Sequence, residues 1–358
     1  ADAAQLRVDW DPAEASAAGL DAADTGGAVS WDSAEADSQA EYDEPSTIQA
    51  LQQVLERTGC VVTVLPADRD LPLRLLQTPP DLVFNIAEGQ NGRSREAQVP
   101  ALLEYLGIPF SGSDATTLAL ALDKTLSKHL LTSQGIRTPQ SVLIEATNPD
   151  WSALAELTLP VIVKPNSEGS SKGIGETAVV QEPGELQRLL TAHLRRAGQP
   201  LLVEEYIAGR EFTVGLLGNG TELRVFPPME VIFSDPAHPI YSYEVKRDFR
   251  RYIRYACPPD IPAPLQAELQ ETAQAVFELF GCRDLARLDF RVDAAGVAWC
   301  IEVNPLPGLA PDYSDYPMLA GFSGLDYEHL IWSILNSALL RYDFAPLDLS
   351  GGANGDQE

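Results

Sequence analysis

The chain has 358 residues, of which 45% are hydrophobic and 22% are charged, and its formal net charge at pH 7 is −27. This length exceeds one ordinary hydrophobic core and predicts two or three packed domains. The acidic balance argues against nucleic acid or an anionic membrane as a partner. Because the sequence has no long apolar run and no charged-then-apolar leader, we expect neither a membrane span nor a secretory signal.

The four cysteines show no Cys-x-x-Cys pair and no other metal-ligand spacing. Buried free thiols in a reducing compartment are the simplest interpretation, so we expect a cytoplasmic protein. The composition is rich in alanine and acidic residues and poor in lysine. Such a composition fits either a salt-adapted host or simple solubility, and both interpretations stay open.

The N-terminal part of the chain is predicted to form an open parallel α/β domain. Residues 5–10 are a candidate first strand, and the acidic stretch 11–43 is expected to be a solvated loop. Apolar spacing predicts a helix over 45–58, before Gly59. Val61–Leu65 and Leu82–Ile86 are expected to be buried parallel strands, so strand and helix alternate.

Helices and strands follow along the rest of the chain, as apolar spacing and β-branched runs indicate. The predicted helices are 95–106, 117–134, 183–196, 264–280 and 327–340, and the predicted strands are 107–110, 161–165, 201–206, 286–292 and 297–303. The last two strands form a hairpin around the turn Asp293–Gly296. The tail Asp348–Glu358 is expected to be disordered.

This last hairpin carries the most informative polar pattern. Because side chains alternate between the faces of a strand, Arg287 and Asp289 share one face, and Glu302 and Asn304 share a face of the partner strand. Two carboxylates and an amide oxygen suit Mg²⁺, which usually also binds phosphate. Arg287 would stabilise negative charge on a reacting carbonyl oxygen. A merely solvated face would not explain the rigid turn Pro305–Gly308 that follows, so we predict a magnesium site.

Two further segments have patterns that fit nucleotide binding. The loop Glu168–Gly175 is rich in Gly and Ser, whose small side chains let backbone N–H groups approach phosphate oxygens, and Lys164 precedes it. No Walker motif and no GxGxxG after the first strand is present, so dinucleotide binding has no support. The strand 202–206 leads into a turn flanked by Glu204 and Glu211, which could bind an adenine edge and ribose hydroxyls.

Together these segments resemble the ATP-grasp superfamily, most closely the D-alanine–D-alanine ligase family, from about Asp81 to Leu335. The residues that carry the resemblance are Gly107–Ser113, Asp123-Lys124, Val163–Pro165, Glu168–Ser171, Glu204–Ile207, Gly209, Glu211, Tyr243-Glu244, Lys246, Gly281-Cys282, Arg287–Asp289, Glu302–Pro305 and Pro307-Gly308. The resemblance implies an ATP-grasp fold, α/β overall and α+β in its ATP-binding part. Its implied parts are an open parallel N-terminal domain at 1–122, a small central subdomain at 123–203, a C-terminal subdomain at 204–345 and a disordered tail at 346–358.

The resemblance also implies an ATP-dependent carboxylate–amine ligase that works through an acyl phosphate. The implied nucleotide-binding residues are Lys124, Lys164, Ser171, Glu204, Glu205, Ile207, Glu211 and Lys246. The implied ligands of two Mg²⁺ ions, or of Mn²⁺ in their place, are Asp289, Glu302 and Asn304. The implied catalytic residues are Arg287, Lys246, Ser170 and Gly308. Its partners would be ATP and amino-acid-like substrates, with a homodimer as an option.

Three departures from the family pattern all concern substrate groups. The N-terminal glycine pair and Ser-x-Glu segment are absent, with the acidic Glu41–Glu44 as a hypothetical replacement. The His-Gly…Gly-Glu-Asp-Gly region reads Asn85–Glu96 here. Arg247 replaces an aromatic residue and either binds a carboxylate or belongs, with Arg250 and Arg251, to a lid over the phosphates. The candidate substrate residues are Arg93, Glu96, Arg247 and Ser314.

We therefore predict an amino-acid ligase whose substrates need not be two D-alanines. One alternative attaches an amino acid to a small-molecule scaffold, as in mycosporine-type natural products. A carboxylase component would need a biotin-carrying partner, and nothing in the sequence resembles a biotin attachment segment. A non-catalytic nucleotide-binding protein would be favoured by loss of a metal ligand, yet all three ligands are present.

Overall fold

The computed structural model describes residues 44–89, 92–145, 152–167, 179–195, 200–233, 253–311 and 313–347. Contacts divide the chain into two compact units. In the described part, unit 1 draws on Thr138–Ala208 and Phe233–Arg254, and unit 2 on Tyr42–Arg137, Gly209–Ile232 and Tyr255–Glu358. The predicted domain limits at 122, 203 and 345 stay a prediction, and the predicted first strand 5–10, the acidic loop 11–43 and residues 348–358 of the tail lie outside the described residues.

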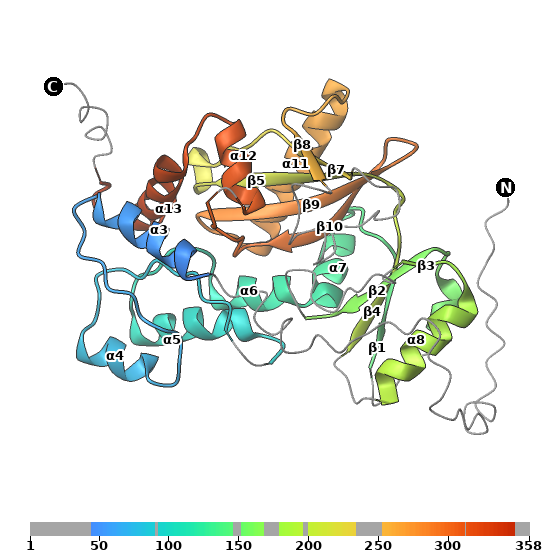
Figure 1. Ribbon diagram of the computed structural model, residues 1–358, viewed down its shortest axis with the longest axis horizontal. Coiled ribbons are helices and arrows are strands. Elements are labelled where there is room, and N and C mark those ends of the chain that lie inside the picture. The colour runs from blue at the N-terminus through green and yellow to red at the C-terminus, as the bar shows by residue number, and fades with distance from the viewer. Residues whose placement is uncertain are drawn as a thin grey trace. The chain divides into compact units, whose positions relative to one another are not determined.

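Unit 1 is built on a four-stranded antiparallel sheet with the order β1-β4-β2-β3. Its strands are β1 (Ser141–Ile144), β2 (Val161–Pro165), β3 (Val179–Val180) and β4 (Leu201–Glu205), and its helices are η2 (Ala153–Glu156) and α8 (Pro183–Arg195). Helix α8 lies beside the sheet, and Leu190 packs against Val163 and Val203 in one core (Figure 1). Since side chains alternate along a strand, Lys164 and Glu204 point to the opposite face.

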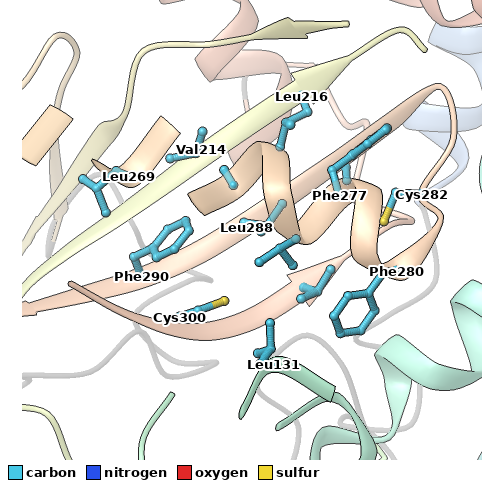
Figure 2. Packing of buried hydrophobic residues seen from close by; sticks show 14 of the residues in the cluster. Leu131, Val214, Leu216, Leu269, Phe277, Phe280, Cys282, Leu288, Phe290 and Cys300 are labelled. Atoms are coloured by element: carbon cyan, nitrogen blue, oxygen red, sulfur yellow. The ribbon is translucent and has the colours of Figure 1, made fainter. Parts of the chain in front are cut away.

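Unit 2 is built on a larger sheet with the order β10-β9-β5-β7-β8, in which β6 also pairs with β5. Its strands are β5 (Gly209–Leu217), β6 (Arg224–Val225), β7 (Met229–Phe233), β8 (Ile253–Ala256), β9 (Leu285–Asp293) and β10 (Ala298–Asn304). Helix α11 (Ala263–Phe280) covers one face, where Phe277 packs with Leu288 and Phe290 (Figure 2). This apolar face leaves the opposite face of β9 and β10 for polar side chains.

Helices α3 (Pro45–Glu56), α12 (Asp315–Phe322) and α13 (Tyr327–Arg341) form a second core on the other side of this sheet. Tyr316 and Leu285 lie in that core, and the Trp332 indole donates to the Val54 carbonyl at 2.9 Å. The packing joins the start of the described chain to its end. It also sets α12 next to the strand end that carries the predicted site.

The remaining helices of unit 2 are α4 (Leu71–Gln77), η1 (Arg95–Ala97), α5 (Gln98–Leu106), α6 (Ala115–Leu122), α7 (Lys124–Ser133) and η3 (Gly220–Glu222). The predicted strand Val61–Leu65 is wrong: these residues form no strand, and Val61 is 99% exposed. Its β-branched residues favour an extended chain, but no described strand pairs with it. Of the predicted strands 82–86 and 107–110, only the parallel bridge Val83–Phe110 forms.

The predicted helix 117–134 is two helices that meet at Asp123. The Asp123 backbone leaves the helical region, and its carboxylate caps α7 by accepting from the Leu126 N–H at 3.1 Å. The apolar spacing continues through the break, which is why it predicts one helix. Helix α7 therefore begins at Lys124. Within the described ranges, no helix combines the length and apolar character needed to cross a lipid bilayer.

Candidate functional site

A register shift in the β9–β10 hairpin brings the predicted metal ligands onto one face. Cys300 pairs with Phe290, but beyond a bulge at Ile301, Glu302 lies opposite Asp289. In the earlier register Ile301 would face Asp289, and Glu302 would turn toward the core. The extra residue therefore sets the two carboxylates side by side. The alternation of each strand alone does not determine this placement.

Arg287 lies between two carboxylates. Its Nε and Nη2 donate to Asp289 at 3.0 and 2.9 Å, and its Nη1 lies 3.7 Å from Asp315 Oδ2. Burial by itself lowers the pKa of the guanidinium, but the charges of Asp289 and Asp315 outweigh it, so the pKa of Arg287 lies above its ordinary value. Arg287 is a fixed positive charge in this site.

The two predicted metal-binding carboxylates each have a cationic partner. Asp289 has Arg287, and it also accepts from the Asn304 amide at 2.9 Å. Glu302 has Lys124, whose Nζ lies 2.8 Å from Oε1 and comes from the first turn of α7. The site thus holds alternating charges, with two acids and two bases on one surface.

The donor set fits magnesium. Two carboxylates and one amide are hard oxygen ligands of the number that Mg²⁺ takes from protein. The Asp289 and Glu302 side chains keep 23% and 28% of their surface exposed, so their oxygens are accessible. No group of three or more His, Cys, Asp and Glu side chains with metal-site geometry occurs among the described residues. A metal here would rest on two carboxylates, Asn304 and the phosphates of a bound nucleotide.

Glu211, on β5, lies on the same sheet face as Asp289. It is two residues further along, because Thr213 lies opposite Asp289 and Glu211 lies opposite Arg291. It pairs in register with Arg291, whose Nη1 lies 3.3 Å from its carboxylate and whose Nη2 donates to the Gly209 carbonyl at 3.1 Å. Arg291 therefore orients the carboxylate predicted to bind ribose. Sequence reasoning missed it, although Arg291 continues the alternating series of Arg287 and Asp289 along β9.

Gly308 and Ser314 meet in the turn between β10 and α12. A Cβ on Gly308 would come within 2.8 Å of the Ser314 hydroxyl oxygen, so any larger residue would displace that oxygen. The same oxygen accepts from the Ala310 N–H at 3.1 Å. The predicted oxyanion glycine and the predicted substrate serine are thus neighbours, ahead of the first turn of α12.

Unit 1 holds a second group of predicted nucleotide residues. The Lys164 ammonium lies 3.1 Å from the Glu204 carboxylate, and both side chains are buried on the sheet face away from α8. Glu205 accepts from the Thr158 N–H at 2.8 Å, which ties β4 to the segment between η2 and β2. Ile207 is half-buried in the segment after β4. The buried pair gives this face a fixed charge pattern.

The predicted substrate residues are only partly described. Arg93 is exposed and its guanidinium lies 2.8 Å from Asp123, the cap of α7, while Glu96 is buried with Arg95 3.7 Å away. Ser170, Ser171, Lys246 and Arg247 lie outside the described residues, as does the loop Glu168–Gly175. Sequence reasoning also missed Asp315, because a single acid in an otherwise apolar helix has no periodic signal.

Comparisons with known proteins agree on one family. A sequence profile described as D-ala D-ala ligase C-terminus matches residues 131–336. The D-alanine–D-alanine ligase of Gloeobacter violaceus is 36% identical over 299 residues, covering 81% of this chain and 93% of that protein. The uncharacterized protein y4sG of Sinorhizobium fredii is 35% identical over 305 residues, covering 83% and 87%.

Solved structures give the same result. The D-alanine–D-alanine ligase from Bacillus anthracis complexed with ATP has a TM-score of 0.67 at 22% identity, covering 83% of this chain and 94% of that one. VanG D-Ala:D-Ser ligase from Enterococcus faecalis has a TM-score of 0.60 at 28% identity, covering 72% and 73%. The first likeness concerns the fold alone.

Proposed function

The chain belongs to the D-alanine–D-alanine ligase family and has its ATP-grasp fold, and from this premise we propose that it forms an amide bond through an acyl phosphate. It is an ATP-dependent ligase that makes C–N bonds. In the proposed reaction a substrate carboxylate oxygen attacks the γ-phosphorus of ATP and ADP leaves. An amine then attacks the acyl carbon, loses a proton, and phosphate leaves.

The observation that carries this proposal is the charge arrangement on the β9–β10 hairpin. Phosphoryl transfer depends mainly on positioning and on neutralising developing charge. Arg287 presents a fixed guanidinium beside two carboxylates whose oxygens remain partly exposed. Arg287 would stabilise the oxyanion that forms when the amine attacks, together with the Gly308 backbone.

Asp289, Glu302 and Asn304 would hold magnesium. When bound, the metal would neutralise phosphate charge and orient the γ-phosphate for in-line attack. Lys124, at the start of α7, would bind a nucleotide phosphate once its contact with Glu302 is exchanged. Glu211 would accept the ribose hydroxyls in the orientation that Arg291 gives it.

Unit 1 would contribute further nucleotide contacts. Lys164 would bind phosphate and adenine, and Glu204 and Ile207 would face the adenine. Their support is the buried Lys164–Glu204 pair, which orders both side chains before ATP arrives. The roles of the remaining predicted nucleotide and catalytic residues, Glu205, Ser170, Ser171 and Lys246, stay predictions.

We propose amino acids as both substrates, bound in part by Ser314, Arg93, Glu96 and Arg247. The family names make two D-alanines the first pair to test, and the VanG title makes D-alanine with D-serine the second. The scaffold-ligase alternative draws no support from the described residues. A cytoplasmic location and a homodimer stay expectations.

Product analysis tests this function directly. Purified protein with ATP and Mg²⁺ should release ADP only when a suitable carboxylate and amine are both present. Mass spectrometry across pairs of D- and L-amino acids would identify the product. If no pair produces ADP, the ligase function proposed here is wrong.

A matched pair of variants tests the site. Asp289→Ala should lower turnover by about 100-fold or more, because it removes charge stabilisation at the reacting phosphate. Asp68→Ala is the control, since Asp68 also pairs with an arginine, Arg74, at 2.8 Å but lies on the surface. Equal turnover in the two variants would remove Asp289 from the mechanism.

A further inference from the structure

Arg287 has a second carboxylate neighbour that the proposed mechanism does not use. Its Nε and Nη2 are committed to Asp289, and its Nη1 faces Asp315 Oδ2 at 3.7 Å. Asp315 is the first residue of α12 and is 7% exposed. Burying a charged carboxylate to this extent costs desolvation free energy unless a cation or hydrogen-bond donor compensates it.

Asp315 is held in place from two sides. The Tyr255 hydroxyl donates to its Oδ1 at 3.0 Å, which leaves Oδ2 directed toward Arg287. The next residue, Tyr316, is fully buried and donates to the Leu216 carbonyl at 2.8 Å, which fixes the first turn of α12 on β5. Gly215 makes room for it, since a Cβ there would lie 3.3 Å from the Tyr316 ring.

The contacts of Asp289 create a competition. Both its oxygens accept hydrogen bonds from Arg287, and one also accepts from Asn304. A cation that binds Asp289 would take oxygen lone pairs that Arg287 now uses. Arg287 would then need another counter-charge, because a buried guanidinium without one is strongly disfavoured.

We propose that Asp315 is a positioning residue: it takes over the Arg287 guanidinium when Asp289 binds the metal. This inference rests on the proposed function. Asp315 thereby does two things, lowering the cost of freeing Asp289 and holding Arg287 where the oxyanion forms. The Tyr255 hydroxyl orients the Asp315 carboxylate, so it acts on Arg287 only through Asp315. Partners of this kind beside metal ligands typically change metal affinity or activity 10- to 100-fold.

Metal binding without turnover gives the direct test. Mn²⁺ would be titrated into the full chain saturated with ADP, and bound Mn²⁺ followed by electron paramagnetic resonance. Asp315→Asn should weaken Mn²⁺ binding about tenfold, because Arg287 then keeps its hold on Asp289. Asp114→Asn is the control: Asp114 pairs with Arg283 at 2.8 Å in the same unit and does not contact Arg287.

Kinetics separate positioning from a merely structural role. In Asp315→Asn, kcat should fall about tenfold while the KM for ATP stays within about twofold, and Asp315→Glu should recover part of both the kcat and the Mn²⁺ affinity. Tyr255→Phe keeps the charge and loses only its orientation, so it should show the same pattern at smaller size. It also serves if Asp315→Asn does not fold.

The outcomes distinguish this inference from the proposed function. If wild type binds Mn²⁺ and forms product, but Asp315→Asn and Asp114→Asn behave alike, Asp315 has no positioning role. If Asp315→Asn only raises the KM of the amine substrate, the positioning role is also overturned, because Asp315 would then be a substrate contact. If wild type binds no Mn²⁺ with ADP, the metal site and this inference both fall.

Discussion

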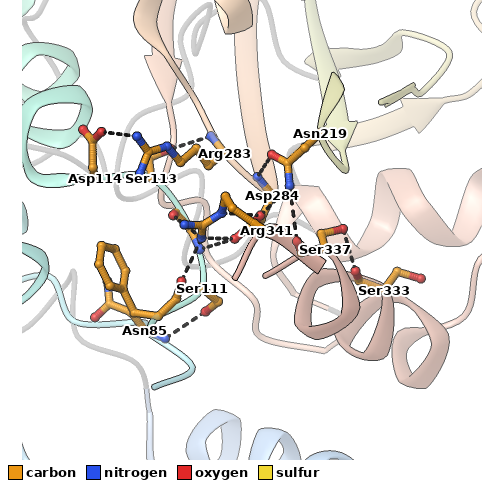
Figure 3. A network of polar contacts seen from close by, with 12 residues as sticks. Asn85, Ser111, Ser113, Asp114, Asn219, Arg283, Asp284, Ser333, Ser337 and Arg341 are labelled. Atoms are coloured by element: carbon orange, nitrogen blue, oxygen red, sulfur yellow. Dashed lines mark hydrogen bonds and ion pairs between the residues drawn. The ribbon is translucent and has the colours of Figure 1, made fainter. Parts of the chain in front are cut away.

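Asp284 and Asp289 both pair with a largely buried arginine in unit 2, yet their surroundings differ. Asp284 is fully buried and accepts from the Gly112 N–H, from Asn219, and twice from Arg341, at 2.7–3.2 Å (Figure 3). The Asp289 side chain remains 23% exposed. Both sites pair an aspartate with an arginine, and they differ in burial and in how many hydrogen bonds the carboxylate accepts, four at Asp284 and three at Asp289.

The saturated pair is a structural junction. Arg341 ends α13 and also donates to the Phe110 and Gly112 carbonyls, so one side chain joins α13, the loop after the Val83–Phe110 bridge, and the start of β9. Burial lowers the pKa of Arg341, but Asp284 raises it by more, so its pKa lies above the ordinary value. The two Asp284 oxygens already accept four hydrogen bonds, which leaves them little capacity for a ligand.

The unsaturated pair fits a binding site. Arg287 and Asp289 keep exposed surface, a second acid and a second base stand beside them, and Asn304 completes the oxygen donors. Exposed oxygens next to fixed charges favour an incoming cation or phosphate. Burial and hydrogen-bond saturation of the carboxylate together therefore distinguish this structural ion pair from the candidate functional one.

The largest expected effect comes from breaking the saturated pair. Asp284→Ala leaves the largely buried Arg341 without its counter-charge, and should lower the free energy of unfolding by about 3–5 kcal/mol. Urea denaturation measures this loss. Asp289→Ala is the comparison, and its free energy of unfolding should change far less. Equal losses would mean that saturation does not separate the two pairs.

Cys282 reports on the same junction. Burial raises its pKa to about 12, so at pH 8 almost no thiolate is present to react. Cys60 is exposed and should react with a thiol reagent at once. In Asp284→Ala the labelling of Cys282 should accelerate, because local unfolding at the start of β9, just after Cys282, becomes more frequent. An unchanged rate would place the junction elsewhere.

Breaking the unsaturated pair should change activity and spare stability. Arg287→Lys keeps a positive charge but loses the planar fork that contacts Asp289 at two points. Turnover should fall about 10²–10³-fold, while the urea midpoint moves little. A steady-state assay with the identified substrate pair measures the first effect. A large fall in the urea midpoint with normal turnover would mean that the Arg287–Asp289 pair is structural and not part of the active site.

A smaller effect is expected next to the site, at Gly308. The Cβ in Gly308→Ala would displace the Ser314 hydroxyl and break its 3.1 Å hydrogen bond from Ala310. Ser314 is a proposed substrate contact, and the bond that holds it is worth about 1 kcal/mol, so we expect the KM of that substrate to rise about fivefold. Ser314→Ala in the same assay should match it. Gly321→Ala is a control for folding, because a Cβ at Gly321 meets open space and its backbone does not have a positive φ.

The smallest effect concerns an exposed carboxylate at the other end of α13. Asp326 caps this helix, and the hydrogen bond from the His329 N–H lowers its pKa below 3.8. A lowered pKa stabilises the fold above pH 3.8, and this contribution disappears as the pH falls through the folded value. Asp326→Ala should therefore cost about 1 kcal/mol at pH 7, and the difference from wild type should shrink as the pH falls below 3.8. A difference in unfolding free energy that is the same at every pH would exclude the carboxylate charge.

Much of the secondary structure could be predicted from sequence. The helices over 183–196, 264–280 and 327–340 are confirmed within a few residues, as is the final hairpin. Each has a clear apolar period or a strong turn. The predictions failed where contacts outside the segment or a helix cap determine the secondary structure. Val61–Leu65 forms no strand because it has no described partner strand. At Asp123 a single cap divides one continuous apolar pattern into two helices.

The residues of the candidate site were predicted, and so was their grouping side by side on the hairpin, although alternation along each strand does not by itself ensure that grouping. Alternation placed Arg287 with Asp289 and Glu302 with Asn304, each pair on its own strand. Whether the pairs share a face depends on the bulge at Ile301. A faint signal existed, since the core-facing Cys300 and Val303 stand three residues apart instead of two. Nothing comparable marked Asp315, which reaches Arg287 only through the packing of α12.

The sequence by itself determined which chemical groups the hairpin carries, because composition and alternation are local properties of one strand. It determined the family through the order of those groups along the chain. Only the tertiary structure decided which ion pair is saturated, because that depends on residues as distant as Gly112, Asp284 and Arg341 meeting in space. Hydrogen-bond saturation is a property of contacts between elements, and no single segment encodes it.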